Sequence, residues 1–240
     1  MWTRNKIWPI LLIIISVGLC YFQTLSFWFI APDSLSLIKS SRLESLSDFF
    51  GIFSNPLMGG TDATLKHVYY RPITTLIYSI EYVIWGLNPL GYHLTNILAH
   101  ALVCIFLYLW LFQLSQKKVF ALAVALFFSV FPICIVNVSA ISRRHDILAS
   151  LFFIISLWSI KESKWISILF FSLALGSKEI SLIFLPLVAT YLWMTQKKYL
   201  KNLIPYIGIT IIYIVWRWIC LDGVGGVIGE HYSESRIGIM

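Results

Sequence analysis

Apolar residues gather in seven runs along the chain, and short polar connections separate them. The runs cover residues 7–30, 91–114, 119–138, 147–160, 165–175, 180–195 and 203–220. A helix needs about 20 apolar residues to cross a bilayer, and its backbone amides must bond within the segment because lipid offers no partners. None of the runs alternates with the period of two that a membrane barrel requires. The pattern therefore predicts an all-α fold, a polytopic transmembrane helical bundle of about seven spans.

The polar connections alternate in charge. One set holds a single acid, Glu162, and is rich in cations: Arg4, Lys6, Lys117, Lys118, Lys161, Lys164, Lys197, Lys198 and Lys201. The other set holds the other ten of the eleven acidic residues. Short loops rich in Lys and Arg stay in the cytoplasm. We therefore expect a cytoplasmic N-terminus and a functional site on the outer face of a bacterial inner or plasma membrane, or the equivalent face of the endoplasmic reticulum.

The longest polar connection, residues 31–90, lies on the acidic side and contains two amphipathic segments. Apolar residues recur with helical spacing in residues 41–53 and again in residues 72–85. Both segments are too short to span, so we expect two helices lying in the outer interface. Residues 1–220 are predicted to form one transmembrane module. The polar tail 221–240 is expected to be the outer-side start of a missing C-terminal part.

Composition and charge narrow the class of protein further. The chain is 59% hydrophobic and only 12% charged, with a mean hydropathy of +0.82, which excludes a soluble globular domain. Half of the basic residues behind the net charge of +7 are accounted for by the cationic loops. No basic stripe alternates with exposed aromatic residues, so nucleic acid is not an expected partner. The four cysteines lie inside apolar runs, at spacings that indicate neither a zinc site nor a disulfide framework.

Asp33 is the first candidate for chemistry. It comes directly after the first apolar run, at the membrane surface, where partial shielding from water can raise the pKa of a carboxyl group. Such a carboxylate can act as a base towards a hydroxyl acceptor. The alternative is a simple helix-end acid, or an N-cap for the segment that follows.

Cations near the ends of the outer segments are the second group of candidates. They come with neighbouring polar residues: Lys66, Tyr70 and Arg71; Arg144 and Asp146; Lys178 and Glu179; and Arg217. A guanidinium suits bidentate phosphate binding, and a cation beside a helix start can form a phosphate cradle. Contact with lipid headgroups, local ion pairs and snorkelling are the alternatives for each one taken singly. Together with Asp33, they converge on one face, as a lipid-linked phosphate substrate requires, whereas a transporter places polar groups near the midplane.

His93, Asn96 and His100 lie along one stripe of the second span. Their spacing allows a metal pair, but no carboxylate shares the stripe. We therefore expect interhelical hydrogen bonds rather than a metal site.

The segments YRPITTL (residues 70–76) and WGLNPLGYHLTNILAH (residues 85–100) resemble the GT-C glycosyltransferase superfamily, in its protein O-mannosyltransferase-like branch. This branch includes the tetratricopeptide-bearing enzymes and bacterial relatives. Ile141 and Ser142 with Arg144 and Asp146, and the Ser177-Lys178-Glu179 turn, fit the same pattern. Pro32 stands where such proteins often have the first Asp of a pair, which leaves Asp33 as the single carboxylate.

The resemblance implies an enzyme that takes sugar from a polyprenyl-phosphate donor and needs no cofactor. A protein or glycan hydroxyl would accept the sugar at the outer face, with Asp33 as general base. The residues expected to contact substrate are Tyr70, Arg71, His93, Arg144, Asp146, Lys178, Glu179 and Arg217. A non-catalytic lipid-phosphate binder or transporter, or an inactive fragment of such an enzyme, is the main alternative, and a structural membrane subunit is the third hypothesis.

Overall fold

The structure is a computed structural model, and it describes residues 7–29, 32–43, 45–55, 57, 69–195 and 199–221. Every regular element within these ranges is a helix, and they contain no strand, so the predicted all-α class is confirmed. Lys66 and all of the predicted outer tail beyond residue 221 lie outside the described residues.

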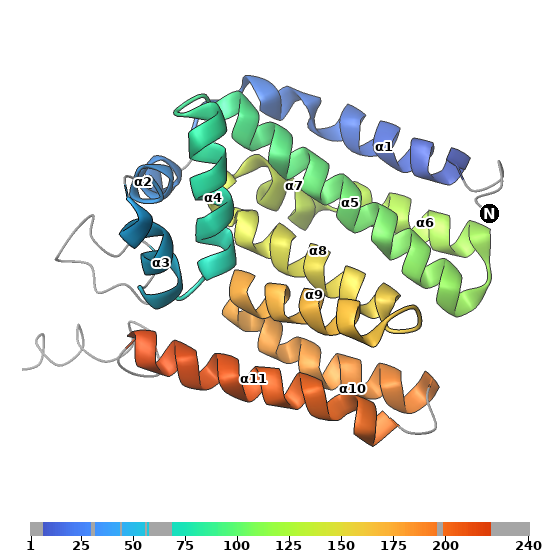
Figure 1. The fold of residues 1–240 in the computed structure, drawn as a ribbon. Coiled ribbons are helices and arrows are strands. Elements are labelled where there is room, and N and C mark those ends of the chain that lie inside the picture. The colour runs from blue at the N-terminus through green and yellow to red at the C-terminus, as the bar shows by residue number, and fades with distance from the viewer. Residues whose placement is uncertain are drawn as a thin grey trace, which may run out of the picture.

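Seven of the helices, with the short α7, form a bundle of elements that run side by side (Figure 1). They are α1 (Ile7–Tyr21), α5 (Pro89–Ser115), α6 (Lys118–Ser129), α7 (Pro132–Ser139), α8 (Arg144–Ser159), α9 (Lys164–Ser177), α10 (Phe184–Thr195) and α11 (Tyr199–Leu221). Three short 3₁₀ helices extend this bundle: η2 (Phe22–Ser26), η3 (Ile141–Arg143) and η4 (Glu179–Ile183).

Three further helices lie together at one end of the bundle, with α4 running across the ends of the long helices (Figure 1). They are α2 (Pro32–Ser40), α3 (Leu46–Ser54) and α4 (Pro72–Trp85). We call this the α4 end. The turns at 86–88 and 140–143 and the α9–η4 junction are also at this end, whereas the α5–α6 and α8–α9 connections are at the other. The alternation of connections predicted from their charge is therefore present in the fold.

Among the described residues, three helical stretches are long and apolar enough to cross a membrane: Ile7–Ser26, Pro89–Ser115 and Lys201–Leu221. Helices α6 and α7 reach that length only as a pair, which would make four, and they are bent by 55°. Pro132 begins α7, where it lacks the amide that would continue the hydrogen-bond ladder, so the predicted single run 119–138 is broken. Helices α8, α9 and α10 have 16, 14 and 12 residues. About seven spans are therefore not confirmed within the described residues.

Two apolar clusters hold the bundle together. One joins α1, α5, α6 and α8 and includes Ile13, Val17 and Cys104, and the other joins α8 to α11 and includes Phe171 and Val188. A buried hydroxyl network links α8, α9 and α11. There, the Ser167 Oγ lies 3.0 Å from the Ser156 Oγ and 2.7 Å from the Tyr206 hydroxyl.

The helices at the α4 end agree in part with the predicted interfacial segments. Helix α4 spans residues 72–85 as predicted, and it ends at Gly86, whose φ of 57° suits glycine. In place of a helix over residues 41–53, α3 begins at Leu46 behind a capping box of Ser45 and Asp48. Helix α2 was not predicted.

Helix α4 turns its polar side inward. Thr74, Tyr78 and Glu81 are buried against the bundle, while Ile80 and Ile84 are 51% and 62% exposed. An interfacial helix with its apolar side towards lipid would have this orientation. The polar side of α4 thus supplies groups to the interior of the α4 end.

Candidate functional site

Arg71 and Glu179 form a two-pronged ion pair between the start of α4 and the start of η4. The Arg71 Nε and Nη2 donate hydrogen bonds of 3.0 and 2.6 Å to the two Glu179 carboxylate oxygens. The Arg71 side chain is only 8% exposed, whereas that of Glu179 is 26% exposed. The Arg71 guanidinium also lies over the Tyr69 ring, at 4.3 Å from its centre. Pairing of this kind holds α4 and η4 in register at the α4 end.

Lys178 and Asp146 form a second pair, between the end of α9 and the first turn of α8. The Lys178 ammonium contacts the Asp146 carboxylate, whose other oxygen lies 3.4 Å from the His145 Nε2. Close packing of α9 on α4 brings the two pairs together. The Thr74 hydroxyl donates to the Ser177 carbonyl at 3.0 Å, one residue before Lys178. We call Arg71, His145, Asp146, Lys178 and Glu179 the ion-pair cluster.

The cluster balances its charges at neutral pH. The two cations match the two carboxylates, so His145 decides the net charge. Burial, and after it the nearby charge of Arg71, lower the pKa of His145 below its ordinary value, so the imidazole is neutral. Burial acts to raise the pKa of Glu179, but the hydrogen bonds and charge of Arg71 outweigh it and lower that pKa. Glu179 is therefore ionised, and the cluster has no net charge.

Arg144 lies inside the protein and not on the cluster surface. Its side chain is fully buried and contacts the Glu81 carboxylate of α4. The Nε donates to Asn96 Oδ1 at 2.7 Å and the Nη2 donates to the Tyr92 carbonyl at 2.6 Å. The guanidinium thus links α4, α5 and α8. The sequence had predicted contact between Arg144 and a donor phosphate, whereas in the structure Arg144 contacts groups of the protein itself.

Tyr70 and Arg217 lie beside the cluster, where α3 meets α11. The Tyr70 hydroxyl donates to the Phe53 carbonyl at 2.8 Å, and the Trp216 indole N–H donates to the same oxygen at 2.8 Å. Tyr213 packs near Tyr70, with 6.4 Å between the ring centres, and its hydroxyl interacts electrostatically with Arg217, Glu179 and Arg71. The structure therefore places Arg217 in the neighbourhood of the cluster, and it gives Tyr70 an anchoring contact.

His93, Asn96 and His100 are buried on α5. Asn96 donates to the Val138 carbonyl at 3.0 Å, and the His100 Nε2 lies 3.3 Å from the Ser129 carbonyl. These are interhelical contacts, as predicted. The His93 ring faces the backbone of Phe27 and Trp28. It therefore lies against the segment that leads towards α2.

Asp33 is the second residue of α2, and its side chain lies outside the described residues. Helix α2 packs against α4 and η3. Asp33 is thus at the same end of the bundle as the ion-pair cluster. Pro32 begins the helix, and Asp33 follows it in the first turn.

Sequence reasoning missed the importance of Glu81 and His145 as partners of the candidate residues. Glu81 is on the polar side of the 72–85 segment, and His145 stands between two candidates. Those positions were visible signals. The sequence did not show which residues pair, because the partners are far apart along the chain. Glu81 and Arg144 are 63 positions apart, and Arg71 and Glu179 are 108 positions apart.

No family model matches the chain, and no solved structure matches it. Three curated relatives are all named protein O-mannosyl-transferase. The chain is 30% identical over 154 residues to TMTC3 of Mus musculus, which covers 64% of this chain and 17% of that protein. It is 34% identical over 138 residues to TMTC2 of Mus musculus, which covers 57% of this chain and 16% of that protein. It is 25% identical over 205 residues to a Caenorhabditis elegans protein of that name, covering 82% and 30%.

The similar region is thus a large part of this chain but a small part of each relative. The chain spans about a sixth of the length of the two mouse proteins. The relatives are glycosyltransferases by name, which agrees with the resemblance seen in the sequence.

Proposed function

We propose that this chain is a membrane module of a glycosyltransferase, which moves a sugar from a polyprenyl-phosphate donor to a hydroxyl of a protein or glycan acceptor. The main support is the meeting of Arg71 and Lys178, from separate parts of the chain, at the end of the bundle that carries Asp33. The names of the relatives support transfer chemistry. The charge of the loops supports an outer-face site with the N-terminus in the cytoplasm.

In the proposed reaction, Asp33 accepts the proton of the acceptor hydroxyl as its oxygen bonds to the anomeric carbon of the sugar. The bond from that carbon to the phosphate oxygen breaks, and the lipid phosphate leaves with the electron pair. This leaving group needs stabilisation of its charge more than a proton. Cations at the same end of the bundle as the proposed carboxylate base meet both requirements.

Arg71 and Lys178 are the groups we propose for the donor phosphate. Glu179 occupies the Nε and Nη2 of Arg71, and the other N–H groups of the guanidinium remain for phosphate oxygens. Lys178 is 19% exposed and can exchange the Asp146 carboxylate for a phosphate oxygen. The resting ion pairs thus keep both cations ordered and compensated until the donor arrives.

Arg144 has a positioning role in this proposal. It is fully buried and holds α4 through Glu81 and α5 through Asn96, so it fixes the helix that begins beside Arg71. Tyr70 and His93 likewise act through the backbone segments that they contact.

The test is sugar transfer from a labelled polyprenyl-phosphate donor in membranes that contain this chain, compared with Asp33→Asn. Glu162→Gln, at the opposite end of the bundle, is the matched control for loss of a carboxylate. We expect the Asp33 variant to lose transfer by at least about a hundredfold, the low end of general-base effects. It should still bind donor. Substantial transfer by this variant would contradict the assignment of the base.

A non-catalytic lipid-phosphate binder is the second candidate, because the ion-pair cluster is complete without Asp33. This function predicts donor binding that needs Arg71 and Lys178, together with no transfer by the unaltered chain. Donor binding by the Arg71→Ala and Lys178→Ala variants, measured beside that of Asp33→Asn, separates the two functions.

A further inference from the structure

Tyr213 on α11 has a hydroxyl group that is buried and unpaired. The side chain is 9% exposed, and among the described residues no group forms a hydrogen bond with its oxygen. A buried polar atom without a partner costs free energy, and a phenylalanine would fill the same space without that cost. Packing therefore does not explain the hydroxyl. Such a group is explained where a ligand forms the hydrogen bond.

The surroundings of this hydroxyl connect it to the ion-pair cluster. The Tyr213 ring lies 6.4 Å from the ring of Tyr70, centre to centre, and Tyr70 directly precedes Arg71 in the chain. The apolar cluster that contains both rings also includes residues of α9 and contacts η4. The charged groups that act on the hydroxyl are Arg217, one turn further along α11, Glu179 and Arg71. The hydroxyl thus belongs to the part of the α4 end where Arg71 and Glu179 pair.

The two cations proposed for the donor phosphate are already compensated by carboxylates. The Arg71 Nε and Nη2 donate to Glu179 at 3.0 and 2.6 Å, and the Lys178 ammonium contacts Asp146. The Tyr213 hydroxyl has no such partner. Its hydrogen bond to a charged oxygen would therefore form without another protein contact being given up.

We propose that the Tyr213 hydroxyl donates a hydrogen bond to an oxygen of the donor phosphate, beside Arg71. This inference rests on the proposed function, because it requires the phosphate at the ion-pair cluster. A phosphodiester has only acceptor oxygens, and the N–H groups of Arg71 and Lys178 and the O–H of Tyr213 are all donors. Helix α11 thereby forms a third side of the phosphate site, with α4 and the α9–η4 junction.

The experiment measures binding to the full chain in phosphatidylcholine nanodiscs, together with the midpoint of thermal unfolding. The probes are a labelled polyprenyl-phosphate sugar donor, polyprenyl phosphate without sugar, and the uncharged polyprenol. In Tyr213→Phe, both phosphate probes should bind about tenfold more weakly, the effect of one hydrogen bond to a charged group, and polyprenol binding should not change. The unfolding midpoint should not fall, because the hydroxyl has no partner to lose.

Two other tyrosines provide matched controls. The Tyr206 hydroxyl, two turns earlier on α11, lies 2.7 Å from the Ser167 Oγ. Tyr206→Phe should therefore show the reverse result, a lower unfolding midpoint with unchanged donor binding. The Tyr191 hydroxyl is also buried, but its ring lies beside Trp110, at 6.1 Å between the ring centres, towards the opposite end of the bundle. Tyr191→Phe should leave donor binding unchanged.

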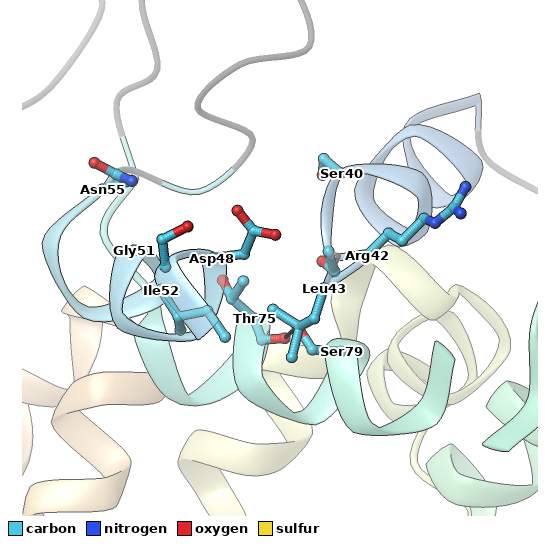
Figure 2. A pocket seen from close by; sticks show the side chains of 11 residues that line it. Ser40, Arg42, Leu43, Asp48, Gly51, Ile52, Asn55, Thr75 and Ser79 are labelled. Carbon is cyan, nitrogen blue, oxygen red and sulfur yellow. Dashed lines mark hydrogen bonds between the residues drawn. The ribbon is translucent and has the colours of Figure 1, made fainter. Parts of the chain in front are cut away.

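A polar cavity of about 370 Å³ between α2, α3 and α4 is the other place at this end where a phosphate could bind (Figure 2). Neither Tyr213 nor any member of the ion-pair cluster lines it. Ser47 is an exposed residue of its lining, so Ser47→Trp fills the cavity, and Ser54→Trp on the same helix, outside the lining, is the control. Both variants should bind donor as the unaltered chain does.

Four results would overturn the proposal. Equal binding by Tyr213→Phe and the unaltered chain would remove the contact and leave the proposed function standing. Weaker binding of the sugar donor alone, with polyprenyl phosphate unaffected, would assign the hydroxyl to the sugar. Loss of binding in Ser47→Trp but not in Ser54→Trp would place the phosphate in the polar cavity. Failure of the unaltered chain to bind either phosphate probe would overturn the phosphate site itself, and the proposed function with it.

Discussion

The pairing of Arg71 with Glu179 explains how a nearly buried cation is held at the α4 end without substrate. Removing a guanidinium from water costs free energy unless a carboxylate neutralises its charge and accepts its hydrogen bonds in a suitable geometry. The two-pronged contact does so, with Arg71 the more buried partner. The phosphate-binding groups proposed here are therefore also structural groups, and their removal should affect stability as well as activity.

Replacing Glu179 by Gln should destabilise the protein by roughly 2 kcal/mol, because Arg71 is left without its countercharge. The midpoint of thermal unfolding in detergent measures the effect. The paired variant Arg71→Met with Glu179→Leu serves as the control, since it removes both charges. Its midpoint should be closer to that of the unaltered protein than the midpoint of either single variant. Strictly additive losses would show that the pair does not couple α4 to η4.

His145 should make the protein less stable in mild acid. Its pKa is lowered in the fold, so below about pH 6.5, the ordinary pKa of histidine, the unfolded chain takes up a proton that the folded chain refuses. Stability therefore falls as the pH falls through that value, until the lower folded pKa is reached. The depressed pKa of Glu179 adds a loss only in stronger acid, below about pH 4.3.

Thermal unfolding between about pH 8 and pH 5, on either side of the ordinary histidine pKa, measures this effect. The unaltered protein should lose stability across the range, and His145→Gln should flatten the decline. An unchanged slope in the variant would assign the acid sensitivity to another group.

Tyr70 and Arg144 show what residue types alone do not reveal. The sequence predicted that these polar groups would share one side, and Arg71, Asp146, Lys178 and Glu179 do converge at the α4 end. It did not indicate that Arg144 would pair with Glu81, or that the Tyr70 hydroxyl would donate to the Phe53 carbonyl. Such choices depend on distances between helices, which no local pattern contains.

At the scale of elements, the close approach of α9 to α4 brings the two ion pairs together. Gly176 makes this approach possible, because a Cβ there would lie 2.7 Å from the Ile73 Cγ1. Ile73 is β-branched and cannot easily move that atom aside. Gly176 is thus required by packing, and not by its backbone angles.

Gly176→Ala should push α9 away from α4, break the Thr74 contact with Ser177, and weaken both ion pairs. We expect a lower unfolding midpoint and weaker donor binding. Gly208→Ala on α11 is the matched control, since nothing lies within 4 Å of its added Cβ and alanine favours a helix. Equal behaviour of the two variants would contradict the packing role of Gly176.

The elements themselves were predictable to different degrees. Helix α4 has a proline at its start, a glycine after its end and a clear apolar stripe, and both of its limits were predicted. Helix α2 was missed because PDSLSLIKS is short and only weakly apolar, although the reading of Asp33 as a cap pointed to it. Pro132 was a visible signal for the bend between α6 and α7, but the continuous apolar run concealed it.

At the scale of the whole molecule, the arrangement of connections is the feature that fixes which side of a membrane the site would face. The α5–α6 and α8–α9 connections share one end, opposite α4. Their lysines favour the cytoplasm. The orientation is therefore a testable property of the assembled chain.

Single cysteines at Ser47 and at Ser163, in a chain whose four native cysteines are replaced by Ala, should label differently with an impermeant maleimide. In intact cells we expect Ser47→Cys to react and Ser163→Cys to react only after the membrane is opened. Ser54→Cys serves as a second position at the α4 end. The reverse pattern would place the ion-pair cluster in the cytoplasm and would contradict an outer-face site.

The contact between α3 and α11 has a consequence for how the chain is made. The Trp216 indole reaches the Phe53 carbonyl across 163 positions, so this bond can form only after nearly all of the described chain has left the ribosome. Helix α3 must therefore wait for α11 before it gains this anchor. The α4 end therefore gains this contact only after α11 has been made, whatever the order in which the helices enter a membrane.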